Sequence, residues 1–254
     1  WSSELSKLIA NAFLAQRISS INSVSAICEE TGADVQEVAL AVGADKRIGN
    51  HFLKAGPGFG GSCFKKDILN LVYICNHYGL YEVASYWQKV IEINDWQQKR
   101  ISSLIVDKLF GNLSGKKISI LGFAFKANTN DTRESPSIKI CKELLQEAVN
   151  LSIYDPRVSR KQIALDLEKS ENLNINKSNS EGSWIFCNSI QECTINSDAI
   201  LILTEWDEFR DINWEVISKH MRKPSWVFDT RSIADLNMAK KYGLNTWRVG
   251  MEYT

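Results

Sequence analysis

The strongest constraint on the fold is a change in the hydrophobic pattern near residues 111–115. Before this point the apolar residues recur with helical spacing only, which predicts helices over 3–31, 34–42, 64–76 and 81–110. The last helix would be about 45 Å long at 1.5 Å per residue, a length typical of helices that bridge two domains or build a dimer interface. The alternative is two shorter helices broken near Asn94.

Beyond the polar turn at 111–115 the pattern alternates between strand and helix. Strands are predicted at 117–123, 151–154, 184–187, 199–203 and 226–228, with a weaker pattern at 245–248. The expected helices cover 136–148, 160–168, 190–194, 214–220 and 233–242. A surface loop, expected to be mobile, spans the Asn- and Ser-rich stretch 171–183. The alternation predicts an α/β chain, in which an all-helical domain (1–110) precedes a Rossmann-like parallel-sheet domain (111–254).

Composition excludes several classes of partner. Thirty basic and thirty acidic side chains cancel, so no net field attracts nucleic acid or an anionic membrane. No apolar run approaches the roughly 18 residues of a membrane span. The six cysteines form no C-x-x-C pair and no cluster with histidine, which argues against a metal site. Scattered free thiols are typical of a reducing cytoplasm, so we expect a cytoplasmic protein.

A glycine-rich loop carries the clearest candidate for chemistry. Four of the six residues Gly56–Gly61 are glycine, which allows the main chain to approach a ligand closely. Cys63 follows at the start of a predicted helix with two lysines beside it, and both features favour thiolate over thiol. Asp67 lies four residues further on and shares a helix face with Cys63, so a nucleophile and a base lie on one element. The alternative is a buried structural cysteine beside a glycine turn.

Three cations follow predicted strands. Lys126 and Arg133 come after the first strand, and Arg231 comes after the fifth. Ligands of open parallel sheets bind at the carboxyl ends of the strands, so these cations together would suit a diphosphate. Taken singly, each is better read as a solvated surface charge.

Several motifs resemble the nucleotide-sugar dehydrogenases. The run G-P-G-F-G-G-S-C-F-K-K-D is similar to the catalytic cysteine loop of that family, and W-S-S-E-L-S-K-L-I-A-N is similar to its central helix. The runs G-F-A-F-K, D-T-R-E-S-P and T-E-W-D resemble its C-terminal, nucleotide-sugar-binding domain. The resemblance covers nearly the whole chain but only the middle and end of the family's chain, because no predicted strand is followed by the G-x-G-x-x-G turn of a dinucleotide-binding domain. It implies a fragment that lacks the N-terminal NAD-binding domain.

The resemblance implies oxidation of UDP-glucose to UDP-glucuronate with NAD as cofactor, and a fragment that is inactive alone. Cys63 would form a thiohemiacetal and then a thioester with the sugar. Lys7 and Asn11 would stabilise the oxyanions, and Asp67 would help to activate water. The alternatives are another substrate, GDP-mannose or a UDP-amino sugar, and a non-catalytic module for sugar binding and dimerisation.

Binding residues also follow from the resemblance. Substrate contacts would come from Arg47 of a neighbouring subunit and from Phe52, Leu53, Lys54, Phe59, Gly60, Phe64, Phe125, Lys126 and Arg231. The NAD contacts left in this chain would be Cys63, Lys66 and Arg133. A homodimer or higher homo-oligomer built from helices 3–31 and 81–110 is expected, because long apolar helices need a partner surface.

Overall fold

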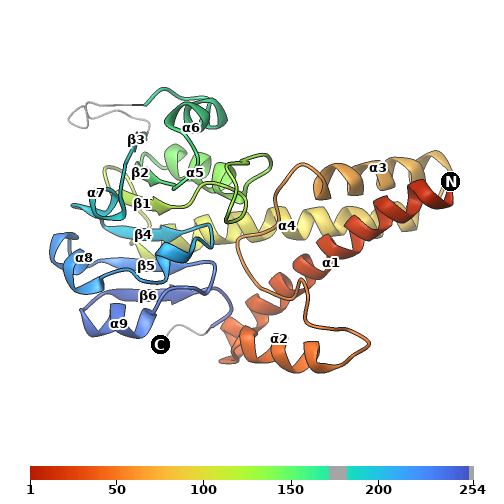
Figure 1. Ribbon diagram of the computed structural model, residues 1–254, viewed down its shortest axis with the longest axis horizontal. Coiled ribbons are helices and arrows are strands. Elements are labelled where there is room, and N and C mark those ends of the chain that lie inside the picture. Colours follow the sequence, from red (N-terminus) through yellow and green to blue (C-terminus); the bar gives the residue numbers. More distant parts are fainter. Residues whose placement is uncertain (172–181, 252–254) are drawn as a thin grey trace. The chain divides into compact units, whose positions relative to one another are not determined.

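A computed structural model describes residues 1–171 and 182–251 (Figure 1). Contacts within the chain divide it into two compact units. The first comprises Trp1–Lys99 and the terminal segment that begins at Val249, and the second comprises Arg100–Arg248. The predicted glycine turn is present, with φ of 70° at Gly111 and 73° at Gly115. The division nevertheless falls earlier, inside a helix, and the functional boundary expected at 111–115 stays a prediction.

Helices build the first unit, and they are α1 (Ser2–Thr31), α2 (Val35–Ala44), α3 (Phe64–His77) and most of α4 (Tyr81–Lys108). Gly32 ends α1 in the left-handed region at φ 76°, which glycine adopts without a Cβ penalty. The side chain of Asp34 accepts the Gln36 N–H and begins α2. Helix α4 is unbroken at Asn94, so the single long helix is confirmed and the broken alternative is wrong.

The core of the first unit lies among α1, α3 and α4. Ala12 and Ala15 of α1 are fully buried, and their small side chains let α3 pack closely against α1, its main helical neighbour. Ile68 of α3 and Trp87 and Val90 of α4 fill the same cluster. Burial of each large apolar side chain contributes about 1.5–3 kcal/mol, which fixes the helices that carry the candidate catalytic residues.

The C-terminal segment of the first unit packs against the end of α1 and the start of α2. Gly250 donates its N–H to Glu29 Oε1 at 2.8 Å and accepts the Val35 N–H at 2.8 Å. Its φ is 73°, and an added Cβ would collide with the Val35 side chain. Sequence patterns did not indicate this return of the chain.

The second unit contains a parallel six-stranded sheet in the order β3-β2-β1-β4-β5-β6 (Figure 1). All six predicted strands are present, as β1 (Lys117–Leu121), β2 (Asn150–Tyr154), β3 (Ser183–Phe186), β4 (Ala199–Ile202), β5 (Trp226–Asp229) and β6 (Asn245–Arg248). The strand order reverses between β1 and β4, and this is the point at which sheets of this kind bind ligands. The predicted Rossmann-like α/β class is confirmed.

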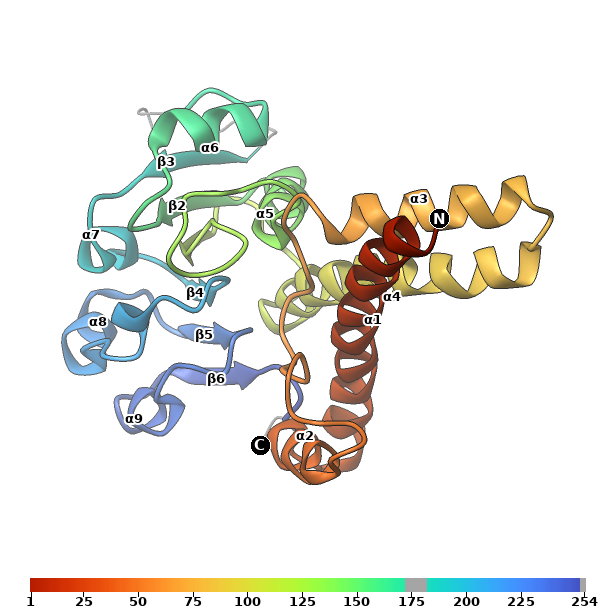
Figure 2. The same cartoon turned by 45° about the vertical axis from the view of Figure 1, so that its right-hand side comes forward.

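Helices flank the sheet on both faces (Figure 2). They are α5 (Pro136–Gln146), α6 (Arg160–Leu167), α7 (Ile190–Thr194), α8 (Trp214–His220) and α9 (Leu236–Lys241), with a short 3-10 turn at Asp207–Phe209. The last helix begins later than the predicted residue 233, because Asp235 caps it while the N–H groups of Ile233 and Ala234 donate to Asp229. Residues 172–181 of the predicted surface loop lie outside the described residues. None of the described helices is long and apolar enough to cross a membrane.

Candidate active site

Cys63 stands at the N-terminus of α3 as its capping residue. It is the one exposed thiol among six free cysteines, and the other five are buried. Its Sγ lies 3.6 Å from Ser62 Oγ, and Gly61 directly before that serine adopts φ 87°. The exposed sulfur lies next to the positive end of the α3 dipole. The alternative of a buried structural cysteine is therefore wrong.

Asn11 and Asp67 join α1 to α3 beside this cysteine. Asn11 Nδ2 donates to Asp67 Oδ2 at 2.6 Å, and the Asp67 N–H donates to the Cys63 carbonyl at 2.8 Å. Lys7 lies one turn before Asn11 and is exposed. Its side chain makes no hydrogen bond or ion pair with any residue of the described chain. Two neighbouring helices thus carry the four candidate catalytic residues, and the amide of Asn11 orients the carboxylate of Asp67.

Buried amide side chains hold the glycine loop in place. Gly56 donates its N–H to Asn22 Oδ1 at 2.9 Å, and its carbonyl accepts from Gln97 Nε2 at 2.9 Å. Asn94 Oδ1 accepts the Phe59 N–H at 2.7 Å, and Asn94 Nδ2 donates to the Phe59 carbonyl at 3.3 Å. These amides satisfy main-chain groups that would otherwise be buried without partners.

The clamp formed by Asn22, Asn94 and Gln97 was not among the predicted site residues. A sequence signal for it exists, because all three are polar residues on the apolar faces of long helices, where a buried amide needs a specific partner. The position of Asn94 also explains why residue 58 is a glycine. Gly58 adopts φ 119°, and a Cβ there would lie 2.7 Å from Asn94 Oδ1.

Three of the candidate substrate residues form an aromatic cluster next to Cys63. The ring of Phe64 lies 5.8 Å from that of Phe59 and 6.3 Å from that of Phe52, both in edge-to-face geometry. Phe52 adopts φ 60° and keeps 43% of its surface exposed. Of the other candidates here, Leu53 and Gly60 are half-buried, and Lys54 and Lys66 are exposed.

Arg47 lies in the turn after α2. Its guanidinium pairs with Asp45 at 2.5 Å while the side chain stays 89% exposed, and the hydrogen bonds from Arg47 lower the pKa of Asp45. It makes no bond to the Cys63 loop within the described chain. Arg17 of α1, which sequence reasoning missed, holds the following turn by donating to the carbonyls of Ile48, Gly49 and His51 at 2.7–2.8 Å.

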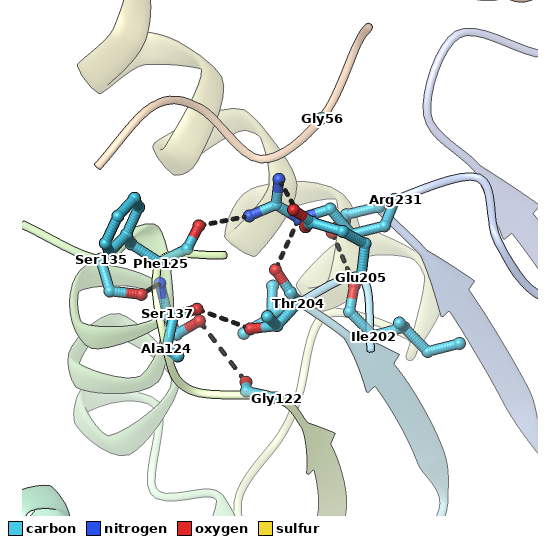
Figure 3. Close-up of polar contacts among 12 residues, drawn as sticks. Gly56, Gly122, Ala124, Phe125, Ser135, Ser137, Ile202, Thr204, Glu205 and Arg231 are labelled. Carbon is cyan, nitrogen blue, oxygen red and sulfur yellow. Dashed lines mark hydrogen bonds and ion pairs between the residues drawn. The ribbon is translucent and has the colours of Figure 1, made fainter. Parts of the chain in front are cut away.

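In the second unit Arg231 ties together three strand ends (Figure 3). Its Nε donates to the Leu203 carbonyl at 2.7 Å, its Nη2 to the Phe125 carbonyl at 3.2 Å, and its Nη1 pairs with Glu205 at 3.1 Å. Burial lowers the pKa of Arg231, although the charges of Glu205 and Asp229 oppose this. The guanidinium therefore stabilises the loops after β1, β4 and β5 as well as offering a positive charge there.

The turn after β1 packs tightly against the end of β4. Thr204 Oγ1 donates to the Ala124 carbonyl at 2.6 Å (Figure 3). Gly122 adopts φ 92°, and an added Cβ would collide with the Thr204 side chain. Only glycine lets these two segments meet at the reversal of strand order.

Asp155, directly after β2, accepts hydrogen bonds from the main-chain amides of the turn that follows β1. Its buried carboxylate accepts the N–H groups of Phe123 at 2.7 Å and Ala124 at 3.1 Å, and the indole N–H of Trp206 at 3.2 Å. In a dinucleotide-binding turn the corresponding amides face the pyrophosphate. Because these amides are occupied, the first turn of this sheet does not fit NAD, in agreement with its lack of G-x-G-x-x-G.

The other two predicted cations lie in the loop between β1 and α5. Lys126 is exposed, with its ammonium 5.3 Å from the centre of the Phe125 ring. Arg133 is exposed and donates to both oxygens of Asp131 at 2.9 and 2.7 Å, which lowers the pKa of Asp131. Across residues 1–171 and 182–251, no three His, Cys, Asp or Glu side chains are grouped to hold a metal.

Comparison with known proteins connects both units to one family. The central-domain profile of the UDP-glucose/GDP-mannose dehydrogenase family matches residues 1–96, and the UDP-binding-domain profile of that family matches residues 119–236. The chain is 55% identical over 236 residues to UDP-glucose 6-dehydrogenase of Bos taurus, covering 92% of this chain and 47% of that protein. It is 51% identical over 262 residues to the Drosophila melanogaster protein of the same name, covering 100% of this chain and 53% of that one.

A solved structure of a UDP-glucose dehydrogenase has the same architecture. The UDP-glucose dehydrogenase of Pyrobaculum islandicum superposes with a TM-score of 0.77 at 27% identity, over 98% of this chain and 50% of that one. This chain spans about half the length of these relatives. The two profile matches, the identities and the shared architecture together show that the chain belongs to the UDP-glucose/GDP-mannose dehydrogenase family.

Proposed function

We propose that this chain is the cysteine-bearing and nucleotide-binding part of an NAD-dependent UDP-glucose 6-dehydrogenase, which oxidises UDP-glucose to UDP-glucuronate. The observation that carries the proposal is the exposed thiol of Cys63 at the start of α3, with the Asn11–Asp67 pair on the adjoining turns. The names of the relatives that are 55% and 51% identical support UDP-glucose as the sugar nucleotide.

In the first unit the chemistry would centre on Cys63. Its thiolate adds to the aldehyde carbon of the half-oxidised sugar, and the carbonyl oxygen becomes an oxyanion. Lys7 and Asn11 stabilise this oxyanion, and the ammonium of Lys7 donates a proton to it. After the second oxidation the sugar is a thioester of Cys63. Asp67 then takes a proton from water, whose oxygen attacks the thioester carbon and releases the acid and the thiolate. Bound NAD⁺ would supply the hydride acceptor for the two oxidations.

Substrate contacts in the first unit would come from the loop and its surroundings. Phe52, Phe59 and Phe64 form an apolar wall beside the thiol, while Leu53, Lys54 and Gly60 would contact the sugar nucleotide through the same loop. Lys66, on the first turn of α3, would lie on the NAD side of Cys63.

In the second unit the strand ends would bind the nucleotide. Lys126 is an exposed cation at that edge and would pair with the diphosphate. Arg231 would add its positive charge, and the half-buried Phe125 ring would pack against the ligand. Arg133 would contact NAD. The occupied amides after β1 support the proposal that most NAD contacts come from residues outside this sheet.

We also propose a homodimer or higher homo-oligomer in which Arg47 acts on the neighbouring subunit. Supporting this, α1 exposes Phe13 and Ile27 by 53% and 60%, and α4 exposes apolar side chains such as Tyr86. The exposed side chain of Arg47 can reach outward. Light scattering that gives the mass of a monomer at micromolar concentration would contradict this.

The six free cysteines also support a reducing compartment such as the cytoplasm.

Calorimetry and absorbance test the proposal on this chain. We expect UDP-glucose to bind more tightly than GDP-mannose or a UDP-amino sugar, and the Lys126→Met variant to bind it about tenfold more weakly. With UDP-glucose and NAD⁺ the chain should produce no NADH absorbance, because no hydride acceptor is held near the sugar and proximity contributes about 7–11 kcal/mol. Tighter binding of GDP-mannose would contradict the substrate, and turnover would contradict the inference that the first turn of the sheet does not hold NAD.

A further inference from the structure

A cavity of about 480 Å³ opens at the amino ends of β1, β2 and β3. This is the edge of the sheet opposite to the strand ends that carry Lys126 and Arg231. Its volume falls within the roughly 300–1,000 Å³ of small-molecule sites. Its lining includes Lys117, Asn150, Ser183, Ile195 and Arg222.

The floor of the cavity is a polar row across three strands. Strand pairing places Lys117 opposite Asn150, and Asn150 opposite Ser183. Side chains alternate along a strand, so this row shares its face with Ser119, whose hydroxyl donates to the Cys193 carbonyl of α7 at 2.7 Å. Helix α7 is only five residues long and ends at Thr194. The Lys117 ammonium bonds to the carbonyl of Ile195, directly after that end, so the polar row lies where the helix no longer covers the face of the sheet.

Two cations, Lys117 and Arg222, line the cavity. The only partner of the Lys117 ammonium among the described residues is the Ile195 carbonyl at 2.6 Å. Burial lowers the pKa of Lys117, repulsion from Arg222 adds to this effect, and the charge of Glu192 opposes it. Arg222 pairs with Asp198 at 2.5 Å, and the same carboxylate accepts the Lys117 main-chain N–H at 2.7 Å. The described residues that line the cavity include these two cations and no carboxylate.

Hydrogen-bond donors complete the cavity. Ser183 Oγ donates to Asn150 Oδ1 at 2.6 Å, which leaves the Asn150 NH₂ group without a partner in the described parts of the chain. An ammonium, a guanidinium and an amide donor on one polar floor match the three or more acceptor oxygens of a phosphate group. A cationic ligand would add to the repulsion between Lys117 and Arg222.

We propose that this cavity binds a phosphate group, either as free inorganic phosphate or on a small organic molecule, through Lys117, Arg222 and Asn150. The site is separate from the proposed nucleotide-sugar site, and it requires neither that site nor the cysteine chemistry.

Thermal unfolding of this chain tests the proposal. Inorganic phosphate at millimolar concentration should raise Tm relative to chloride at equal ionic strength, because a ligand that binds only the folded state stabilises it. Lys117→Met should abolish the increase. Lys116→Met removes the same charge from the neighbouring residue outside the cavity and should keep it, and Lys117→Arg should keep most of it. AMP in place of phosphate distinguishes the two sources, since a larger shift with AMP indicates an organic phosphate.

Three results would overturn the proposal. The first is no phosphate-specific shift with either phosphate or AMP. The second is an equal shift in Lys117→Met and in the unmodified chain. The third is loss of the shift when UDP is present in excess, which would place the phosphate at the opposite edge of the sheet. If Lys117→Met does not fold, calorimetry on Lys117→Arg and Arg222→Gln replaces it, with Kd for phosphate expected to rise about tenfold in Arg222→Gln. An unchanged Kd in that variant contradicts the site.

Discussion

Asn11 of α1 donates its amide N–H to the carboxylate of Asp67 of α3 across 2.6 Å. The two residues are far apart in the sequence, yet this bond fixes the candidate base one helical turn from Cys63. Asp67 is half-buried and forms no ion pair with the described residues, and the amide of Asn11 supplies its carboxylate with a hydrogen-bond donor.

Asp67→Asn tests the role of this carboxylate. In a complete dehydrogenase that contains this chain, the variant keeps the shape of the side chain but cannot take a proton from water. We expect kcat to fall about 100-fold or more, within the range of general acid–base contributions, while the Kd for UDP-glucose is unchanged. The matched control is Glu37→Gln, which neutralises an exposed carboxylate on α2. Unchanged kcat in Asp67→Asn would exclude Asp67 as the base.

Cys63 should be alkylated by iodoacetamide before any other cysteine. Its thiol is exposed at a helix N-terminus, and the remaining five are buried. Peptide mass spectrometry across a time course measures the order of labelling. Cys63→Ser should leave the folded chain almost unlabelled. Labelling of Cys28 or Cys75 at the rate of Cys63 would contradict this prediction.

The glycine loop should be sensitive to a single methyl group. Gly58→Ala places a Cβ 2.7 Å from Asn94 Oδ1 at φ 119° and disturbs two buried hydrogen bonds. Gly49→Ala is the control, because Gly49 also has a positive φ (71°) but open space around it. We expect Gly49→Ala to lower the free energy of unfolding by about 1–2 kcal/mol, and Gly58→Ala to lower it by about 1–3 kcal/mol more.

Urea denaturation measures both changes. If the two glycine variants lose equal stability, the contact with Asn94 is not what restricts residue 58. Asn94→Ala should itself cost about 1–3 kcal/mol, because the Phe59 N–H and carbonyl are then buried without partners.

Asp131 should make the stability depend on pH. The hydrogen bonds of Arg133 lower the pKa of Asp131 in the folded chain, so its contribution is present above the unfolded value of about 3.9 and is lost as the pH falls through the folded pKa. Because Arg133 is exposed, we expect Asp131→Asn to cost less than about 1 kcal/mol at neutral pH. The difference from the unmodified chain should shrink in urea titrations near pH 3 or below. A difference that grows in acid would contradict this assignment.

Local patterns predicted much of this protein. The six strands and the long helices follow from hydrophobic spacing, which a chain expresses residue by residue. The glycine-rich loop and Cys63 are contiguous in the sequence, so their placement at a helix start could be read directly. The start of α9 was missed because main-chain groups donate to Asp229, a partner outside the local pattern.

What the sequence by itself determined was therefore the kind and order of elements and the cysteine loop, because short-range spacing encodes both. Only the tertiary structure decided which distant side chains meet. The clamp of Asn94 on Phe59, the three bonds of Arg231 and the polar row at Lys117 each join residues dozens of positions apart. Their partners are set by helix packing and strand order, and the spacing of residues along the chain carries no record of either.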